Sequence, residues 1–248
     1  MANDYEQNYD NYSNNGYSPV TEEGPFSSGY AESYDENKVL GKVFTKMGIG
    51  LGISAIAAMA SYYFLGELMY VAYLPLIIIE LILVLVFSLK LQSMSVTAAN
   101  GCFIAYALIN GLTLSSIFYV YEIGSIFTTF FIAAAMFGGA ALYGKVTNKN
   151  LAGMGTYLLM GLLGIIIAGI VNIFIQNSML DFIITIIGII IFVGLTAYDV
   201  NKIRGFAHAY AGEGDFMEKL VIHSALALYL DFINIFLKIL RFFGKRKN

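Results

Sequence analysis

Seven long apolar runs constrain what this chain of 248 residues can fold into. Each run approaches the roughly 20 residues, at 1.5 Å of rise per residue, that a helix needs to cross a bilayer. The runs cover residues 42–65, 69–89, 97–119, 124–144, 152–175, 179–200 and 220–243. They show no alternation of period two, and a backbone inside a membrane must satisfy its own hydrogen bonds. We therefore expect an all-α, polytopic membrane protein with seven transmembrane helices.

The first 37 residues have a different composition from the rest of the chain. They hold eight acidic residues and no lysine or arginine, with almost no aliphatic residues. Such a segment cannot bury enough apolar surface to offset the entropy of folding. We expect residues 1–37 to be a disordered acidic tail and residues 38–248 to be the seven-helix domain.

Lysine and arginine mark alternate loops and so indicate an orientation. They lie before or at the start of the first run and in the second, fourth and sixth connections, at Lys38, Lys42, Lys46, Lys90, Lys145, Lys149, Lys202, Arg204 and Lys219. We expect a multi-pass protein of the cell membrane with a cytoplasmic N-terminus. Seven full spans would place residues 245–247 outside, against their charge. The last helix either crosses against this bias or enters the membrane and returns.

Small residues within the runs indicate close packing between helices, because backbones can approach where no large side chain intervenes. These residues are Ala134, Ala135, Gly138, Gly139, Gly161, Gly164 and Gly169. Packing within one chain is favoured over a dimer interface.

Two aspartates interrupt the last two runs. Asp231 lies near the middle of the final run, where a carboxylate costs about 2.5 to 3.5 kcal/mol, so it is expected to face the bundle interior and to have a partner. Asp199 lies at the inner end of the sixth run. Neighbouring antiparallel helices can turn these two carboxylates toward each other. Counting from the flanking lysines, however, their depths differ by roughly 10 Å, so spacing alone does not establish the pairing.

Two carboxylates in a low-dielectric site cannot both ionise cheaply, so a shared proton near neutral pH is expected. A hard cation such as Ca²⁺ can replace that proton, because it takes oxygen ligands. The pair is therefore a candidate proton sensor and a transient calcium site.

Other charged residues in the runs have competing interpretations. Glu80 in the second run either lines an ion path or makes a structural hydrogen bond to a neighbouring helix. Lys238 and Arg241 are expected to reach the interface or lipid phosphate, in preference to a gating role. Asp181 is expected to begin a helix at the interface.

The sequence does not favour an enzyme. It contains no nucleophile–base pair and no metal-ligand run of the HExxH type. Its one cysteine, Cys102, excludes an intrachain disulfide and a cysteine metal cluster. We expect no cofactor and no nucleic-acid partner.

Four segments resemble the bacterial branch of the Bax inhibitor-1 family, also called transmembrane Bax-inhibitor-motif proteins. They read AYALINGLTLSSIF, MFGGAALYGKVTNKNLAGMG, FVGLTAYDVNKIR and ALALYLDFINIFLKILRFFG. The resemblance covers about residues 38–245, and the last two segments are its most specific part.

The resemblance implies a seven-helix fold with a central last helix and a pH-dependent calcium leak across the membrane. It also implies that Asp199 and Asp231 form the family's di-aspartyl proton sensor. A family arginine near the end of the second helix, which latches onto the first aspartate, has no arginine counterpart here. Lys90 is nearby but offers a point charge and not a planar fork.

The leading hypothesis is a pH-sensitive calcium leak channel, with the lipid bilayer, calcium ions and protons as its partners. Deprotonation of the Asp199–Asp231 pair would shift a helix-packing equilibrium and let cations pass. The alternative is a non-conducting membrane regulator that binds a membrane protease or a stress-response protein.

Overall fold

The computed structural model describes residues 36–66, 68–209 and 214–247. The tail prediction, up to residue 35, lies outside them. The helices in this part of the chain are α2 (Glu36–Phe64), α3 (Leu68–Lys90), α4 (Val96–Leu114), α5 (Ile117–Val120), α6 (Ile123–Val146), α7 (Ala152–Ile175), α8 (Ser178–Ala209) and α9 (Gly214–Phe243). With α4 and α5 counted as one segment, seven helical segments of the described chain are long and apolar enough to span a membrane. This confirms the predicted fold class.

Several helix ends differ from the predicted ones. α2 begins at Glu36, inside the predicted tail. The predicted long connection, residues 201–219, is wrong, because α8 continues to Ala209 and α9 begins at Gly214. The sequence prediction ended each helix where its apolar run gives way to polar residues. A helix that extends beyond the apolar layer can carry polar residues exposed to water and has no reason to stop.

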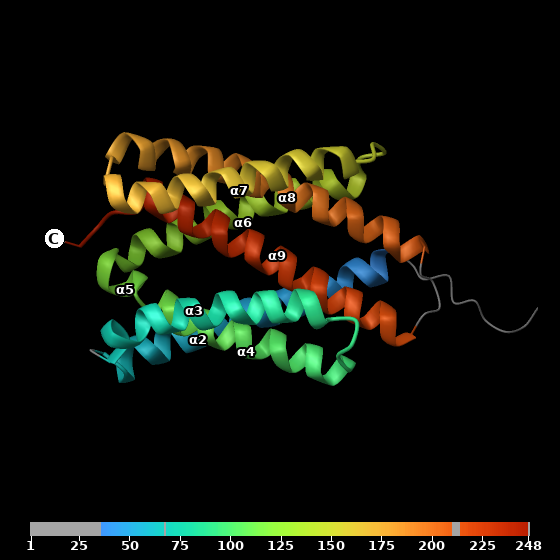
Figure 1. Cartoon of the computed structure of the whole chain (residues 1–248), viewed down its shortest axis with the longest axis horizontal. Coiled ribbons are helices and arrows are strands. Elements are labelled where there is room, and N and C mark those ends of the chain that lie inside the picture. Colours follow the sequence, from blue (N-terminus) through green and yellow to red (C-terminus); the bar gives the residue numbers. More distant parts are fainter. Residues whose placement is uncertain (1–35, 67, 210–213, 248) are drawn as a thin grey trace, which may run out of the picture. The chain divides into compact units, whose positions relative to one another are not determined.

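Helix α9 is the centre of the bundle. In its most apolar stretch 67% of the residues are buried, against 6% in α3 and in α7. It packs against α2, α4, α6 and α8, and Figure 1 shows it running between α2–α4 on one side and α6–α8 on the other. The expectation of a central last helix is confirmed.

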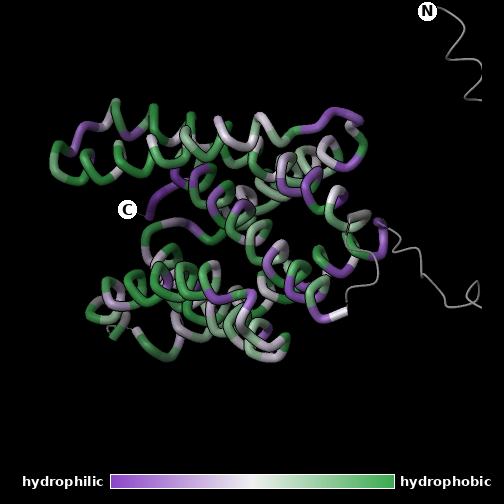
Figure 2. Tube along the Cα trace, turned by 45° about the vertical axis from the view of Figure 1, so that its right-hand side comes forward, coloured by the Kyte–Doolittle hydropathy of each residue, from purple (hydrophilic) through white to green (hydrophobic). Residues whose placement is uncertain are grey.

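Helices α3 and α7 form the periphery. α3 packs mainly on α4, and α7 on α8. Most of their large apolar side chains are exposed, as at Val71, Leu85 and Ile167. Figure 2 shows hydrophobic residues along the helices and hydrophilic residues gathered toward their ends. Such a surface is suited to hydrocarbon, because apolar side chains gain nothing from burial when lipid tails surround them.

Two glycines permit the closest approach of helix backbones. A Cβ atom added at Gly111 of α4 would lie 2.5 Å from the carbonyl oxygen of Ser54 in α2. A Cβ atom added at Gly144 of α6 would lie 2.3 Å from the carbonyl oxygen of Ala197 in α8. These contacts hold α2 to α4 and α6 to α8.

Most of the small residues singled out from the sequence are not at such contacts. Cβ atoms at Gly138, Gly139, Gly164 and Gly169 would meet open space, and only Gly161 has a neighbour, Ile191. That part of the packing prediction is wrong. Residue spacing shows which small residues share a face of a helix, but not whether that face meets lipid or another helix.

The C-terminal segment lies beside the turn between α5 and α6. Lys245 pairs with Glu122 at 2.8 Å, and the Glu122 amide donates a 2.9 Å hydrogen bond to the Lys245 carbonyl. This turn and the α7–α8 turn are at one end of the bundle, here called the C-terminal end. The loops after Lys90 and after Lys145 are at the other, called the basic end. α9 therefore runs from one end of the bundle to the other as one continuous helix, which favours seven complete spans over the re-entrant alternative.

The close contact between α6 and α8 predicts a sensitive position. Gly144→Ala would drive a Cβ atom into the Ala197 backbone and should lower the free energy of unfolding by about 1–3 kcal/mol, as overpacking does. Thermal unfolding in detergent measures the loss. Gly139→Ala, on the same helix but facing open space, should change little. Equal stability of the two variants would contradict the assigned helix contact.

Candidate functional site

Asp231 lies in the middle of α9 and is buried, with 5% of its surface exposed. Because α9 is enclosed by four helices, this position faces protein and not lipid. Among the residues that the structure describes, the Oδ2 atom of Asp231 has no hydrogen-bond partner. A buried carboxyl oxygen without a partner costs free energy, and more so if the group is charged. A proton or a cation bound at this oxygen would lower that cost.

Helix α8 supplies the nearest polar groups. The Thr196 hydroxyl lies within hydrogen-bonding range of the Asp231 carboxyl group, and Asp199 is close enough for the two carboxylates to repel each other. Thr196 and Asp199 are three residues apart on α8, so they share a face of the helix. Asp231 therefore faces the part of α8 that carries both residues.

The surroundings of Asp199 change toward the basic end. Asp199 is half-buried, and Lys202 is the nearby cation on the same helix. His223 of α9, also near Lys202, stacks on Phe87 of α3 with ring centroids 6.1 Å apart. A cavity of about 790 Å³, lined in part by Tyr198 and Lys202, opens at this end. Asp199 therefore lies between Asp231 and a polar cavity.

Lys90, the predicted latch, is not brought to this site. It ends α3 with an exposed side chain, and α3 packs mainly on α4. Within the described residues, Lys202 is the cation beside Asp199. A lysine three residues along the same helix lies within reach of a carboxylate, and the sequence spacing shows this neighbour directly.

Glu80 belongs to a hydrogen-bond network that crosses the bundle. It accepts hydrogen bonds from Asn110 and Thr113 of α4. The Tyr229 hydroxyl donates to the Asn110 side chain at 2.8 Å and lies 2.7 Å from the hydroxyl of Ser54 in α2. Helices α2, α3, α4 and α9 are therefore joined through polar side chains. Of the two interpretations of Glu80, the contacts favour the structural hydrogen bond.

The sequence reasoning did not identify Thr196, Asn110 or Tyr229. Each is a polar residue inside an apolar run, and that is a usable signal, since polar groups inside a membrane protein need partners. It does not by itself show which partner each group has.

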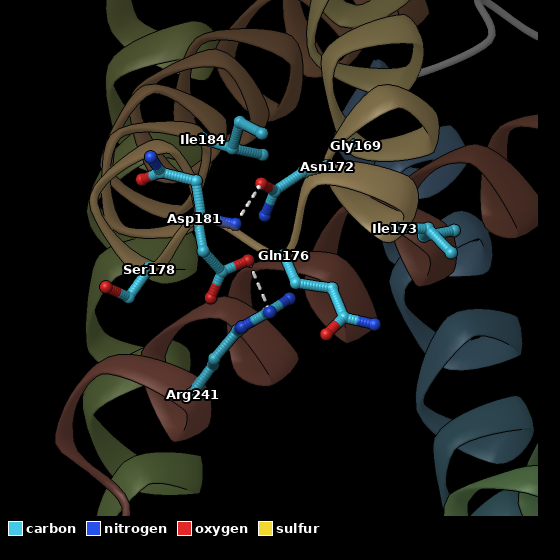
Figure 3. Close-up of a pocket in the computed structure, with 9 residues that line it drawn as sticks. Gly169, Asn172, Ile173, Gln176, Ser178, Asp181, Ile184 and Arg241 are labelled. Atoms are coloured by element: carbon cyan, nitrogen blue, oxygen red, sulfur yellow. Dashed lines mark hydrogen bonds and ion pairs between the residues drawn. The ribbon is translucent and has the colours of Figure 1, made fainter.

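A second polar cluster lies at the C-terminal end of the bundle, where α8 begins and α9 ends. Figure 3 shows Arg241 of α9 directed at Asp181, with which it forms an ion pair. Gln176 adopts a left-handed conformation with φ of 54°, and the Asn177 amide donates to Asn172 at 3.1 Å. A cavity of about 350 Å³ lies among these residues. Arg241 meets a carboxylate of α8, where the sequence suggested the interface or lipid phosphate.

The described residues contain no group of three or more histidine, cysteine, aspartate or glutamate side chains suited to hold a metal. Ca²⁺ in a stable site takes six to eight oxygen ligands. Asp199 and Asp231 provide only part of such a set. They fit brief contact with a passing ion better than a resident one.

Comparison with known proteins adds relatives of the whole helical region. The family model described as "Inhibitor of apoptosis-promoting Bax1" matches residues 36–248. The chain is 41% identical over 214 residues to the inner membrane protein YbhL of Escherichia coli, covering 84% of this chain and 92% of that one. An uncharacterized protein of Borreliella burgdorferi is 43% identical over 221 residues, covering 86% and 94%. An uncharacterized membrane protein of Streptococcus pyogenes is 34% identical over 217 residues, covering 84% and 93%.

The polar network around Tyr229 predicts a stability effect. Tyr229→Phe would remove the hydroxyl shared by Ser54 and Asn110 and should lower the free energy of unfolding by about 1 kcal/mol, the scale of hydrogen bonds within membrane bundles. Denaturant or thermal unfolding in detergent measures this. Tyr157→Phe, at an exposed position of α7, is the control and should be neutral. A neutral Tyr229→Phe would show that the network adds nothing to stability.

Proposed function

Because this multi-pass membrane protein belongs to the Bax inhibitor-1 family, we propose that it is a pH-sensitive calcium leak channel gated by Asp199 and Asp231. It acts without chemistry on a substrate and without a resident cofactor. Calcium is the permeant ion, and protons control its passage.

This proposal rests on the surroundings of the Asp231 carboxyl group. The carboxyl group is buried, its Oδ2 atom has no hydrogen-bond partner within the described part of the chain, and a second carboxylate repels it. A proton relieves both costs, and so does a cation between the two groups. Protons and Ca²⁺ therefore compete for the same place, which is the requirement for a pH-dependent cation path.

Gating follows from the position of α9. When both aspartates are ionised, their repulsion acts directly between α8 and α9, which pack along their lengths. Loss of the shared proton shifts the packing equilibrium of these helices and opens a path past the pair. Lys202 and His223 are the titratable groups nearest on the basic side, and Lys202 moderates the charge of Asp199.

We expect calcium flux into liposomes containing the purified protein to rise as the pH increases from about 5 to 8, by up to about tenfold per unit if one proton controls opening. Asp231→Asn cannot lose a proton and should abolish the pH dependence. The fluorescence of a calcium indicator trapped inside the liposomes measures the calcium flux.

Asp215→Asn, an exposed position near the start of the same helix, is the matched control and should keep the wild-type profile. Circular dichroism and the elution volume in detergent establish that each variant is folded. No flux above protein-free liposomes at any pH would refute the channel and favour the non-conducting regulator. Flux that falls as the pH increases would refute the proposed direction of gating.

For location, we propose the cell membrane, with the N-terminus and the basic end in the cytoplasm. The lysine-bearing loops lie together at the basic end, as the positive-inside rule requires. The C-terminal lysines lie at the other end, where Lys245 pairs with Glu122. The inner-membrane description of the Escherichia coli relative supports this location.

The proposed orientation predicts that the two termini lie on opposite sides of the membrane. A reporter active only in the cytoplasm should function when fused to the N-terminus and fail at the C-terminus. A reporter active only outside should behave in the opposite way. Cytoplasmic activity at both termini would contradict seven complete spans.

A further inference from the structure

Lys238 is a half-buried cation in the path between the aspartates and the C-terminal end of the bundle. It follows Asp231 by seven residues, which is two helical turns, or about 10 Å, along the same face of α9. A cation enclosed at this depth needs a specific environment.

The facing surface of α8 is shaped to receive this side chain. The Lys238 ammonium lies 6.0 Å from the centre of the Phe192 ring. A Cβ atom at Gly188 would lie 2.3 Å from the Lys238 Cε atom and 2.6 Å from its Nζ atom. Glycine at position 188 therefore leaves the space that the lysine side chain fills. Any larger residue would push the ammonium aside.

The cavity in Figure 3 lies just beyond Lys238. Asp181 and Arg241 line it, and both are close enough to Lys238 to interact with it electrostatically. Asp181 attracts the ammonium, and Arg241 repels it. The lysine is thus held between the aspartates and this cavity.

A line of facing residues, here called the seam, runs along the α8–α9 interface and carries charged groups near both of its ends. Thr196 and Asp199 of α8 face Asp231, Gly188 and Phe192 face Lys238, and Asp181 faces Arg241. The spacing of these positions on each helix keeps them on one face. The seam is acidic toward the basic end of the bundle and carries two cations toward the C-terminal end.

We infer that Lys238 is the electrostatic barrier of the ion path, holding cations between the aspartate pair and the C-terminal cavity. This inference rests on the proposed channel function and assigns its second control point. The aspartates attract a cation into the seam, and the ammonium two turns away opposes its exit. Protonation acts at the first point and the fixed charge of Lys238 at the second.

The barrier has a signature that a purely structural residue would not have. Coulomb repulsion grows with the charge of the ion, so Lys238 opposes Ca²⁺ about twice as strongly as K⁺. Removing the positive charge should raise calcium flux more than potassium flux. A loosened bundle would instead leak both ions alike.

The test measures calcium and potassium flux in liposomes at a pH where the wild-type protein conducts. Lys238→Met keeps the apolar stem and removes the charge. It should raise calcium flux by about tenfold and increase the calcium-to-potassium ratio. Lys238→Arg retains the charge and should retain the low ratio.

Gly188→Ala is a second and independent variant, because it displaces the ammonium without changing any charge. It should change the ratio in the same direction as Lys238→Met, to a smaller extent. Gly205→Ala, on the same helix with open space at its Cβ position, is the matched control and should behave as wild type.

The two proposals fail in different ways. If wild-type protein conducts with its pH dependence, but neither Lys238→Met nor Gly188→Ala changes the ratio, the barrier is refuted and the channel stands. If one of these variants does not fold, the other decides. If folded wild-type protein and both variants conduct nothing at any pH, the channel is refuted, and the barrier with it.

Discussion

The structure depends on α9, a helix whose polar side chains must find their hydrogen-bond partners within the protein. α9 is surrounded by α2, α4, α6 and α8, so the side chains of Tyr229 and Asp231 are buried among helices. Tyr229 is satisfied on one side by Ser54 and Asn110. Asp231 is satisfied only in part, since its Oδ2 atom has no partner in the regions described by the structure. Burial therefore leaves Tyr229 with hydrogen-bond partners and the Asp231 carboxyl group without a full set of them.

Tyr229 and Asp231 connect α9 to different neighbouring helices. Through Tyr229, α9 is tied to α2 and α4, and through Asn110 to Glu80 of α3. The Ser54 and Asn110 side chains of this network are neutral and do not titrate, and among the described residues Glu80 is its one carboxyl group. Through Asp231, α9 meets α8, where a second carboxylate lies nearby. In the proposed channel, a change of charge there would act on the α8–α9 interface and not on the side that the Tyr229 network holds.

The interface with α8 also explains why its small residues matter where they do. Gly188 makes room for Lys238, and Ala197 receives Gly144 of α6. α8 is thus packed closely on two sides while carrying Thr196 and Asp199 toward α9. Tight packing of this kind has discrete alternatives and does not deform continuously. In the proposed channel, this favours two packed states over a gradual widening.

The sequence by itself determined the helical class, the seven spans and the unusual cost of Asp231, because run length, hydropathy and the price of a charge in hydrocarbon are properties of a single segment. It also pointed to Asp199, through its place in the preceding run. Only the tertiary structure decided which groups meet. The predicted glycines Gly138 and Gly139 face open space, and Lys90 lies away from Asp199. Which helix a face meets, and at what depth, depends on the packing of all the helices together.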